Sequence, residues 1–253
     1  MTTIRDWLFS IPTLLAFGLT LLFFDLSGRV ALWFGLRPFE WTMAGLQKTL
    51  LGVFRISGVR FDVEGLENFE PTGGYLFVSN HQSMYDIPIF GGILVRNFPK
   101  YVAKTSLARG IPAISLNLRR GANALIDRGD REQAVEAITE MARGAQERDV
   151  SAVIFPEGTR SRDGSVGIYR VAGVAALMDG APDLMIVPTV IDGSWKVFAN
   201  NMLPVPFGTR VRVRFAEPIP RTGDEDASAI VEQCQSWAGE VLDSWHQGSA
   251  PST

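Results

Sequence analysis

Histidine and cysteine are scarce in this chain of 253 residues, which contains two histidines and one cysteine. A single thiol, Cys234, cannot form a disulfide within the chain, and no C-x-x-C or comparable zinc spacing occurs. We therefore expect no metal site and a reducing compartment. Basic residues are also too few for a nucleic-acid surface, because the formal net charge is −3. We expect no nucleic-acid partner, and any site for a polyanion must be local.

Charge is missing from the N-terminal region. The run WLFSIPTLLAFGLTLLFF (Trp7–Phe24) carries no charged residue over 18 positions, which is the lower end of what a membrane-spanning helix needs. A second apolar stretch, VALWFGL, begins at Val30 and contains Trp33, and Trp41 follows it; tryptophan is enriched at membrane interfaces. These features predict two adjacent membrane-associating helices within residues 1–58. The length leaves open whether they span the bilayer or enter one leaflet.

Two alternatives compete for this N-terminal region. The first is a buried helix of a soluble domain, although Pro12 and Gly18 are poor choices for a helix that relies on intrinsic propensity. The second is a signal peptide. A signal peptide begins with a positively charged region, but here Arg5 stands next to Asp6, and no A-x-A cleavage site follows the apolar run.

Beyond residue 58 the pattern changes to short strand-like runs that alternate with helical periodicity, which indicates an α/β domain over residues 59–247. We expect a mixed, largely parallel central sheet flanked by helices, followed by a flexible tail at residues 248–253. The expected strands are Tyr75–Asn80, Ser151–Pro156, Leu184–Ile191 and Arg210–Phe215. Helical spacing of apolar residues marks Arg131–Glu147 and Ile230–Trp245, and we expect the latter to pack on the core rather than to face a membrane.

An aspartate follows the first histidine at a distance of five residues in SNHQSMYDIP (Ser79–Pro88). Within one regular helix the two side chains would point about 140° apart. If the strand ends at Asn80 and a helix begins just before Pro88, the carboxylate of Asp86 can fold back and accept an imidazole N–H. This fixes the tautomer of His81 and leaves its other nitrogen free to take a proton from a hydroxyl. The alternative is a structural histidine that closes a turn.

A second polar turn follows the apolar run in VIFPEGTRS (Val153–Ser161). A strand that ends in a glycine-containing turn leaves backbone N–H groups free, and arginines add planar donors suited to phosphate oxygens. This is an anion site in outline, and its alternative is a solvated polar turn. The residues of interest are Glu157, Gly158, Thr159, Arg160 and Arg162.

Two further cations, Lys104 and Arg128, stand at the ends of short apolar runs. Isolated cations at such positions are often solvated surface residues. Ligands of open α/β sheets, however, gather at the carboxyl ends of the strands, where His81, Glu157 and Arg160 are also expected.

Together these stretches resemble the glycerophospholipid acyltransferases, the family typified by 1-acyl-sn-glycerol-3-phosphate acyltransferase. The resemblance covers roughly residues 75–191 in four blocks that follow the family's order. The blocks are NHQSMYD, the segment from Lys104 to Arg128, FPEGTRS, and IVPTVI at Ile186–Ile191. An N-terminal helix pair is also found in bacterial members of this family.

The resemblance implies a role for each block. His81 would deprotonate the free hydroxyl of a lysophospholipid while Asp86 orients the imidazole, and the hydroxyl would attack the thioester of acyl-CoA or acyl-carrier protein. Pro188 would shape the acyl-donor side, and no cofactor is needed. The residues implied to bind the phosphate are Glu157, Gly158, Thr159, Arg160, Lys104 and Arg128. We expect a membrane-bound enzyme at the cytoplasmic face of the inner membrane, with membrane lipid and the acyl donor as partners.

The sequence departs from the family pattern in two places. The second block reads KTSL where many members have Lys-x-Glu-Leu, and YRVAG stands where F-K-x-G is common. Lysophosphatidate is the expected acceptor, with a lyso-aminolipid or another lysolipid as the alternative. A serine lipase is disfavoured because no G-x-S-x-G elbow occurs. A non-catalytic lipid-binding member of the fold would retain binding without turnover.

Overall fold

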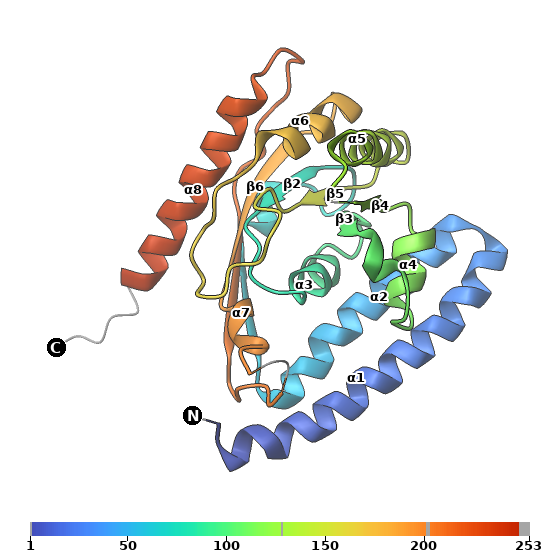
Figure 1. The fold of residues 1–253 in the computed structure, drawn as a ribbon, viewed down its shortest axis with the longest axis vertical. Coiled ribbons are helices and arrows are strands. Elements are labelled where there is room, and N and C mark those ends of the chain that lie inside the picture. Colours follow the sequence, from blue (N-terminus) through green and yellow to red (C-terminus); the bar gives the residue numbers. More distant parts are fainter. Residues whose placement is uncertain (1, 128, 201–202, 248–253) are drawn as a thin grey trace.

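A seven-stranded sheet forms the centre of the molecule in the computed structural model, which describes residues 2–127, 129–200 and 203–247 (Figure 1). The strand order is β1-β7-β6-β2-β5-β3-β4, and every neighbouring pair is parallel except β6 and β7. The strands are β1 (Arg60–Glu64), β2 (Leu76–Ser79), β3 (Lys100–Lys104), β4 (Ala124–Ile126), β5 (Ala152–Ile154), β6 (Ile186–Asp192) and β7 (Arg210–Phe215). The predicted mixed, largely parallel sheet is confirmed.

Helices cover both faces of this sheet. The longer ones are α1 (Ile4–Ala31), α2 (Leu36–Phe54), α3 (Asp86–Ile93), α4 (Ile114–Arg120), α5 (Arg131–Glu147), α6 (Val171–Gly180) and α8 (Ala227–Gln247). The short ones are α7 (Ser194–Val197) and the 3₁₀ turns η1 (Leu32–Phe34), η2 (Arg55–Ser57), η3 (Leu66–Asn68) and η4 (Thr105–Ala108). In Figure 1, α8 lies on the opposite side of the sheet from α2 and α3.

Alternate residues of the central strands face two separate cores, as the period of a strand requires. Leu76 and Val78 of β2 pack in the core that α5, α6 and α8 cover. Phe77, between them, packs in the core that α2 and α3 cover. Because both faces are covered, β2 and β6 are buried at every position, which explains why they read as continuous apolar runs.

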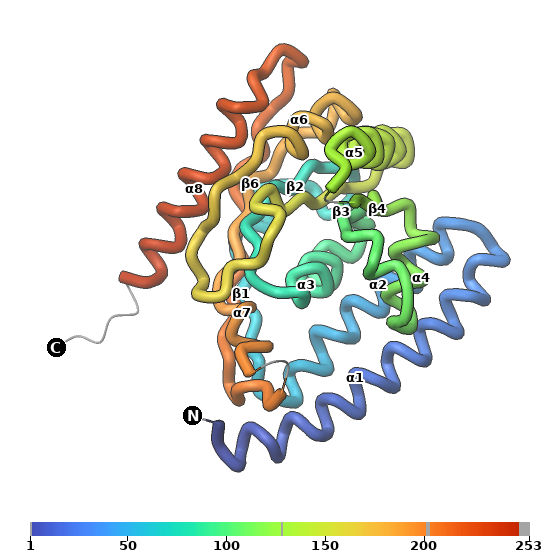
Figure 2. The backbone as a smooth tube through the Cα atoms, in the orientation of Figure 1, coloured from blue at the N-terminus to red at the C-terminus, as the bar shows by residue number. Residues whose placement is uncertain are grey.

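The helices α1 and α2 form an antiparallel hairpin that lies along one side of the molecule (Figures 1 and 2). α2 turns its apolar side inward, where Phe39, Leu46 and Leu50 are buried in the core shared with α3. For α2, the packing is therefore that of a core helix. Among the described helices, the segment Ile4–Phe34 is the one that is long and apolar enough to cross a membrane, and little of it is buried in the protein.

The N-terminal part of helix α1 has the reverse of the usual polarity, because Asp6, Ser10 and Thr13 are buried against the protein. Asp6 Oδ1 accepts the Phe207 N–H at 2.8 Å, and Ser10 Oγ accepts the Val205 N–H at 2.8 Å. The opposite side, here called the outer face of α1, is apolar and exposed. It consists of Leu8, Ile11, Leu15, Leu19, Leu22, Phe23 and Leu26, each at least 58% exposed.

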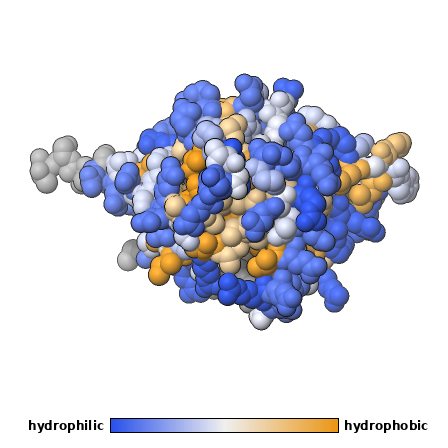
Figure 3. All heavy atoms as spheres, turned by 90° about the horizontal axis from the view of Figure 1, so that it is seen from above, coloured by the Kyte–Doolittle hydropathy of each residue, from blue (hydrophilic) through white to orange (hydrophobic). Residues whose placement is uncertain are grey.

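The turn that joins α1 to α2 is also apolar and exposed. Trp33 is 82% exposed and Phe34 is 74% exposed, both within η1. Figure 3 shows a largely hydrophilic surface from above, with apolar groups at the end of the molecule opposite the C-terminal tail, where Figure 1 places this turn. Exposed apolar surface of this extent marks a site of contact with a partner or a membrane.

A buried ion cluster fixes α2 to the rest of the protein. The Glu40 carboxylate of α2 accepts Lys100 Nζ of β3 at 2.5 Å and Arg148 Nη1 at 2.9 Å. Burial lowers the pKa of Lys100 to about 8, against the opposing effect of Glu40, which favours the charged amine. Removing a partner from such a cluster leaves an uncompensated buried charge, so these contacts hold α2 in one position.

Most elements predicted beyond residue 58 are confirmed. Helix α5 and strand β7 have the predicted bounds, and α8 packs on the core through residues such as Cys234 and Ala238. The strand β7 alternates between buried and more exposed positions as expected. The division of the chain at residue 58 stays a prediction, and the predicted tail at 248–253 lies outside the described residues.

Candidate active site

The predicted site lies where the parallel strands β2 and β5 end. β2 ends at Ser79, immediately before Asn80 and His81, and α3 begins at Asp86. The sequence-based expectation of a strand, a turn carrying the histidine and a helix beginning before Pro88 is confirmed. β5 ends at Ile154 and leads into the turn that begins at Pro156. Because β2 and β5 are parallel neighbours, the two turns lie at the same edge of the sheet.

Asn80 fixes the point at which the chain leaves β2. Its side-chain Nδ2 donates to the Ile191 carbonyl at 2.9 Å, and its Oδ1 accepts the Ile191 N–H at 2.8 Å. Both residues are fully buried. The amide thereby continues the pairing between β2 and β6 through a side chain, and the backbone at His81 is free to turn away from the sheet.

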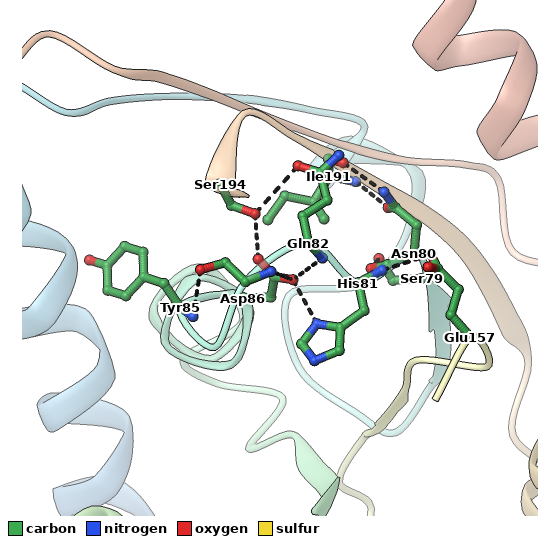
Figure 4. A network of polar contacts seen from close by, with 10 residues as sticks. Ser79, Asn80, His81, Gln82, Tyr85, Asp86, Glu157, Ile191 and Ser194 are labelled. Atoms are coloured by element: carbon green, nitrogen blue, oxygen red, sulfur yellow. Dashed lines mark hydrogen bonds and ion pairs between the residues drawn. The ribbon is translucent and has the colours of Figure 1, made fainter. Parts of the chain in front are cut away.

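The carboxylate of Asp86 organises the turn between β2 and α3 (Figure 4). Oδ2 accepts the backbone N–H groups of Gln82 and Ser83 at 2.7 and 2.9 Å, and it contacts His81 Nδ1 at 2.8 Å. Because a carboxylate only accepts, the neutral imidazole carries its proton on Nδ1 and presents Nε2 as an acceptor. In Figure 4 the second ring nitrogen points away from Asp86 and the polar network.

The turn after β5 holds His81 from the other side. The His81 N–H donates to Glu157 Oε1 at 3.0 Å, and the His81 carbonyl accepts the Ser161 N–H at 2.8 Å. The ring of Phe155 stacks on the imidazole at a centroid separation of 4.2 Å and an interplanar angle of 18°. The backbone and the ring of His81 are therefore both fixed, while 15% of its side chain stays exposed.

The carboxylate of Glu157 is turned into the protein. Burial raises the pKa of Glu157, although the hydrogen bonds from the His81 and Gly167 backbone N–H groups act in the opposite direction. Gly158 follows in the left-handed conformation, with φ of +66°, which favours glycine and turns the chain outward after Glu157. Glu157 thus contacts His81, whereas Thr159 and Arg160, after Gly158, face solvent.

A hollow of about 340 Å³ adjoins this turn. Its lining includes two arginines, and in the described chain neither guanidinium has a hydrogen-bond or ion-pair partner. The residues that line it are Glu157, Thr159, Arg160, Ser161, Arg162, Asp163, Ser165 and Gly167. His81 does not line the hollow, but its backbone is joined to two residues that do, because Glu157 accepts the His81 N–H and the Ser161 N–H donates to the His81 carbonyl.

Lys104 and Pro188, two other predicted site residues, do not line this hollow. Lys104 is the last residue of β3, at the same edge of the sheet but two strands from β2, and it is exposed. Pro188 is buried within β6, where it lies opposite Val78. Arg128 lies outside the described residues. The roles expected for these three residues, and the expected absence of a metal, stay predictions.

Two contacts of the site were not predicted from the sequence. Phe155 falls within the FPEGTRS block, but nothing in the sequence indicates that its ring stacks on His81. Ser194 donates to Asp86 Oδ1 at 2.6 Å from 108 residues further along the chain, outside the four blocks. Only the strand order, which brings the end of β6 beside β2, identifies it.

Comparison with known proteins identifies the family. A family model described as Acyltransferase matches residues 60–192, which is more than half of the chain. The chain belongs to the acyltransferase family. The matched region extends from β1 to the end of β6 and contains both blocks of the site, His81 to Asp86 and Phe155 to Ser161.

Individual members of the acyltransferase family are similar over much of the chain. The 1-acyl-sn-glycerol-3-phosphate acyltransferase alpha of Ovis aries is 28% identical over 191 residues, which are 74% of this chain and 64% of that protein. The 1-acyl-sn-glycerol-3-phosphate acyltransferase of Cocos nucifera is 28% identical over 179 residues, which are 69% of this chain and 54% of that protein. The match thus spans less than two thirds of the length of these relatives.

The fold of this acyltransferase family member is also found in a solved structure. The crystal structure of the 1-acyl-sn-glycerophosphate acyltransferase of Thermotoga maritima superposes with a TM-score of 0.73 and 21% identity, covering 99% of each chain. The likeness in fold therefore extends over nearly the whole chain.

We expect Asn80→Ala to lower the free energy of unfolding by about 2–4 kcal/mol, because it leaves the buried N–H and C=O of Ile191 without partners. Denaturant unfolding in detergent measures the change. Asn68→Ala is the control, since Asn68 is partly buried and its side chain makes one hydrogen bond to the Phe215 carbonyl. Equal, small losses in the two variants would contradict the role given to Asn80.

Proposed function

We propose that this protein transfers a fatty acyl group from acyl-CoA or acyl-carrier protein to the free hydroxyl of a lysophospholipid. The acceptor that fits best is 1-acyl-sn-glycerol-3-phosphate, which would give phosphatidic acid. The observation that carries the proposal is the fixed imidazole of His81, with Nδ1 on Asp86 and Nε2 open, bound through its backbone to a turn whose hollow is lined by two unpaired arginines. The names of the relatives agree with this reaction.

The acyl transfer follows from the chemistry of these groups. His81 Nε2 takes the proton of the acceptor hydroxyl as its oxygen attacks the thioester carbonyl carbon. The imidazolium that forms is stabilised by the Asp86 carboxylate. The tetrahedral intermediate expels the thiolate of the donor, which takes the proton back from His81. The products are an ester and a free thiol, and no acyl-enzyme forms.

The acceptor phosphate would bind at Arg160 and Arg162. Both guanidinium groups line the hollow, and both lack a partner in the described chain, so they are free to form paired hydrogen bonds with phosphate oxygens. Glu157 has a different part in this proposal, because its carboxylate accepts the His81 N–H and would repel a phosphate. We therefore assign Glu157 to holding His81 rather than to binding substrate.

A membrane supplies the acceptor, and the outer face of α1 fits such a surface. This face is apolar from Leu8 to Leu26, while Asp6, Ser10 and Thr13 of the same helix are buried against the protein. In water this arrangement would expose a large contiguous apolar surface at considerable cost, but in the acyl-chain region of a bilayer the same surface is favourable. Membrane association through α1 is part of the proposal, and we propose the cytoplasmic face of the inner membrane as the location.

We expect His81→Ala to lower kcat/KM by about 10³-fold, because the reaction loses its general base. The assay uses purified protein in detergent, labelled acyl-CoA and a panel of lysolipids, with the product identified by mass spectrometry. His246→Gln is a matched control, since it removes the second histidine, which lies on α8 and is 52% exposed. Substantial turnover by His81→Ala would refute the mechanism. A wild-type protein that binds lysolipid without turnover would favour the non-catalytic alternative.

We expect Arg160→Ala to raise the KM for 1-acyl-sn-glycerol-3-phosphate by about tenfold to a hundredfold, with little change in kcat, because it removes a charged hydrogen bond to the phosphate. The difference between the variant and the wild type should vanish for a monoacylglycerol acceptor, which has no phosphate. Arg143→Ala, an exposed arginine of α5, serves as the control. A loss of kcat with unchanged acceptor KM would show that Arg160 acts elsewhere.

We expect Leu15→Glu/Leu19→Glu to abolish binding to phosphatidylcholine vesicles, because burying each carboxylate in a bilayer costs about 2–3 kcal/mol. Vesicle flotation measures the bound fraction, and the uncharged surface of these lipids removes simple charge repulsion as an explanation. Val135→Glu, an exposed apolar position on α5, is the control. Flotation of the double variant at the wild-type level would refute the role of the outer face of α1.

A further inference from the structure

A buried serine completes the surroundings of the Asp86 carboxylate (Figure 4). Ser194 Oγ donates to Asp86 Oδ1 at 2.6 Å, and both residues are 0% exposed. The same hydroxyl lies 3.5 Å from Gln82 Oε1, which is too long to compete for its single proton. The hydroxyl is therefore committed to Asp86.

The two oxygens of Asp86 have different partners. Oδ2 takes the two backbone N–H groups of the turn and faces His81 Nδ1. Within the described part of the chain, Oδ1 accepts one hydrogen bond, from the hydroxyl of Ser194. The backbone bonds hold one oxygen in place, and a bond to the second oxygen sets the rotation of the carboxylate plane about that point. The direction from which Oδ2 meets the imidazole therefore depends on Ser194.

The fold delivers Ser194 to this position through a turn that requires glycine. β6 ends at Asp192, and Gly193 follows with φ of +81°, in the left-handed region. A Cβ at Gly193 would lie 2.2 Å from the carbonyl oxygen of Arg210, so no larger residue fits without moving β7. Asp192 is held by Arg212 of β7 at 2.7 Å. Contacts with β7 thus fix Asp192 and Gly193, the two residues that lead into Ser194.

We propose that Ser194 is a positioning residue of the site, which holds the Asp86 carboxylate at the angle that keeps His81 in the Nδ1–H tautomer. The inference rests on the proposed role of His81 as general base. Loss of the hydroxyl frees Oδ1 from its partner, the carboxylate rotates about Oδ2, and part of the imidazole population moves its proton to Nε2. An imidazole protonated at Nε2 cannot take the proton of the acceptor hydroxyl.

The first test is kinetic. Ser194→Ala should lower kcat about tenfold, because the orientation of the base changes. The KM values for the acceptor and for acyl-CoA should stay within twofold, because substrate binding does not change. Ser151→Ala is the matched control. Ser151 is also 0% exposed and accepts the Tyr75 N–H at 3.1 Å, but it precedes β5 at the opposite edge of the sheet. It should lose stability without losing kcat.

The second test observes the imidazole directly and needs no substrate. The chain has two histidines, so ¹⁵N-histidine NMR of tag-free protein in detergent shows two rings, and the spectrum of His246→Gln identifies that of His81. With the His81 ring neutral, the wild type and Ser151→Ala should show the Nδ1–H tautomer. Ser194→Ala should show a measurable Nε2–H fraction, and Ser194→Cys, which nearly keeps the shape but donates weakly, should lie between them.

An unchanged His81 tautomer in folded Ser194→Ala would overturn the inference, whether or not kcat falls. If Ser194→Ala fails to fold, the same two readings on Ser194→Cys decide. Failure of the proposed function is a separate result, because it would appear as absent acyl transfer in the wild type while the tautomer still responds to Ser194.

Discussion

The carboxylate of Asp86 is the group on which the rest of the site depends. It accepts two backbone N–H groups of the turn that follows β2, the hydroxyl of Ser194 and the imidazole of His81. The same side chain therefore closes the turn and orients the histidine. Since Asp86 satisfies the backbone of the turn, His81 does not have to, and its second nitrogen stays available. If the carboxylate that orients His81 came from outside the turn, a second group would be needed to accept the backbone N–H groups of Gln82 and Ser83.

The two signature blocks work as one structural unit although 76 residues separate His81 from Glu157. Glu157 and Ser161 bind the N–H and the C=O of His81, and Phe155 covers one face of its ring. This arrangement also separates charges. The carboxylate of Glu157 points inward to the backbone of His81, and the arginines beyond Gly158 line the hollow. The acceptor phosphate proposed to bind there would meet these cations, while the carboxylate of Glu157 is already engaged.

The sequence was sufficient for the parts of the fold that depend on local pattern. Continuous apolar runs predicted β2, β5 and β6, alternation predicted β7, and helical spacing predicted α5 and α8. The strands β1, β3 and β4 were not predicted, because they are short and charged residues interrupt β1 and enclose β3, as in RFDVE and KYVAK. Their pairing depends on neighbours far along the chain, which no local pattern records.

The candidate site divides in the same way. The contact between His81 and Asp86 was predicted from spacing and the position of Pro88, because both lie in one turn. Ser194 and the stacking of Phe155 depend on strand order and on ring direction, so the sequence gives no sign of them. The helix α1 is an intermediate case. Its apolar character was evident from composition, but its polar inner side was not, because Asp6, Ser10 and Thr13 bond to residues far along the chain, in the loop before β7 and in η2, besides their local bonds within α1.

The inward polarity of α1 has a consequence for how the hairpin is held. Ordinary surface helices adhere to a protein because water drives their apolar sides together, and that force disappears where lipid tails replace water. The end of α1 that carries Asp6, Ser10 and Thr13 is joined instead by hydrogen bonds, for which acyl chains offer no competing donors or acceptors. Its attachment is therefore of a kind that survives transfer into a bilayer, and in the proposed membrane-bound state α1 and the turn of His81 and Asp86 would keep a fixed relation to each other.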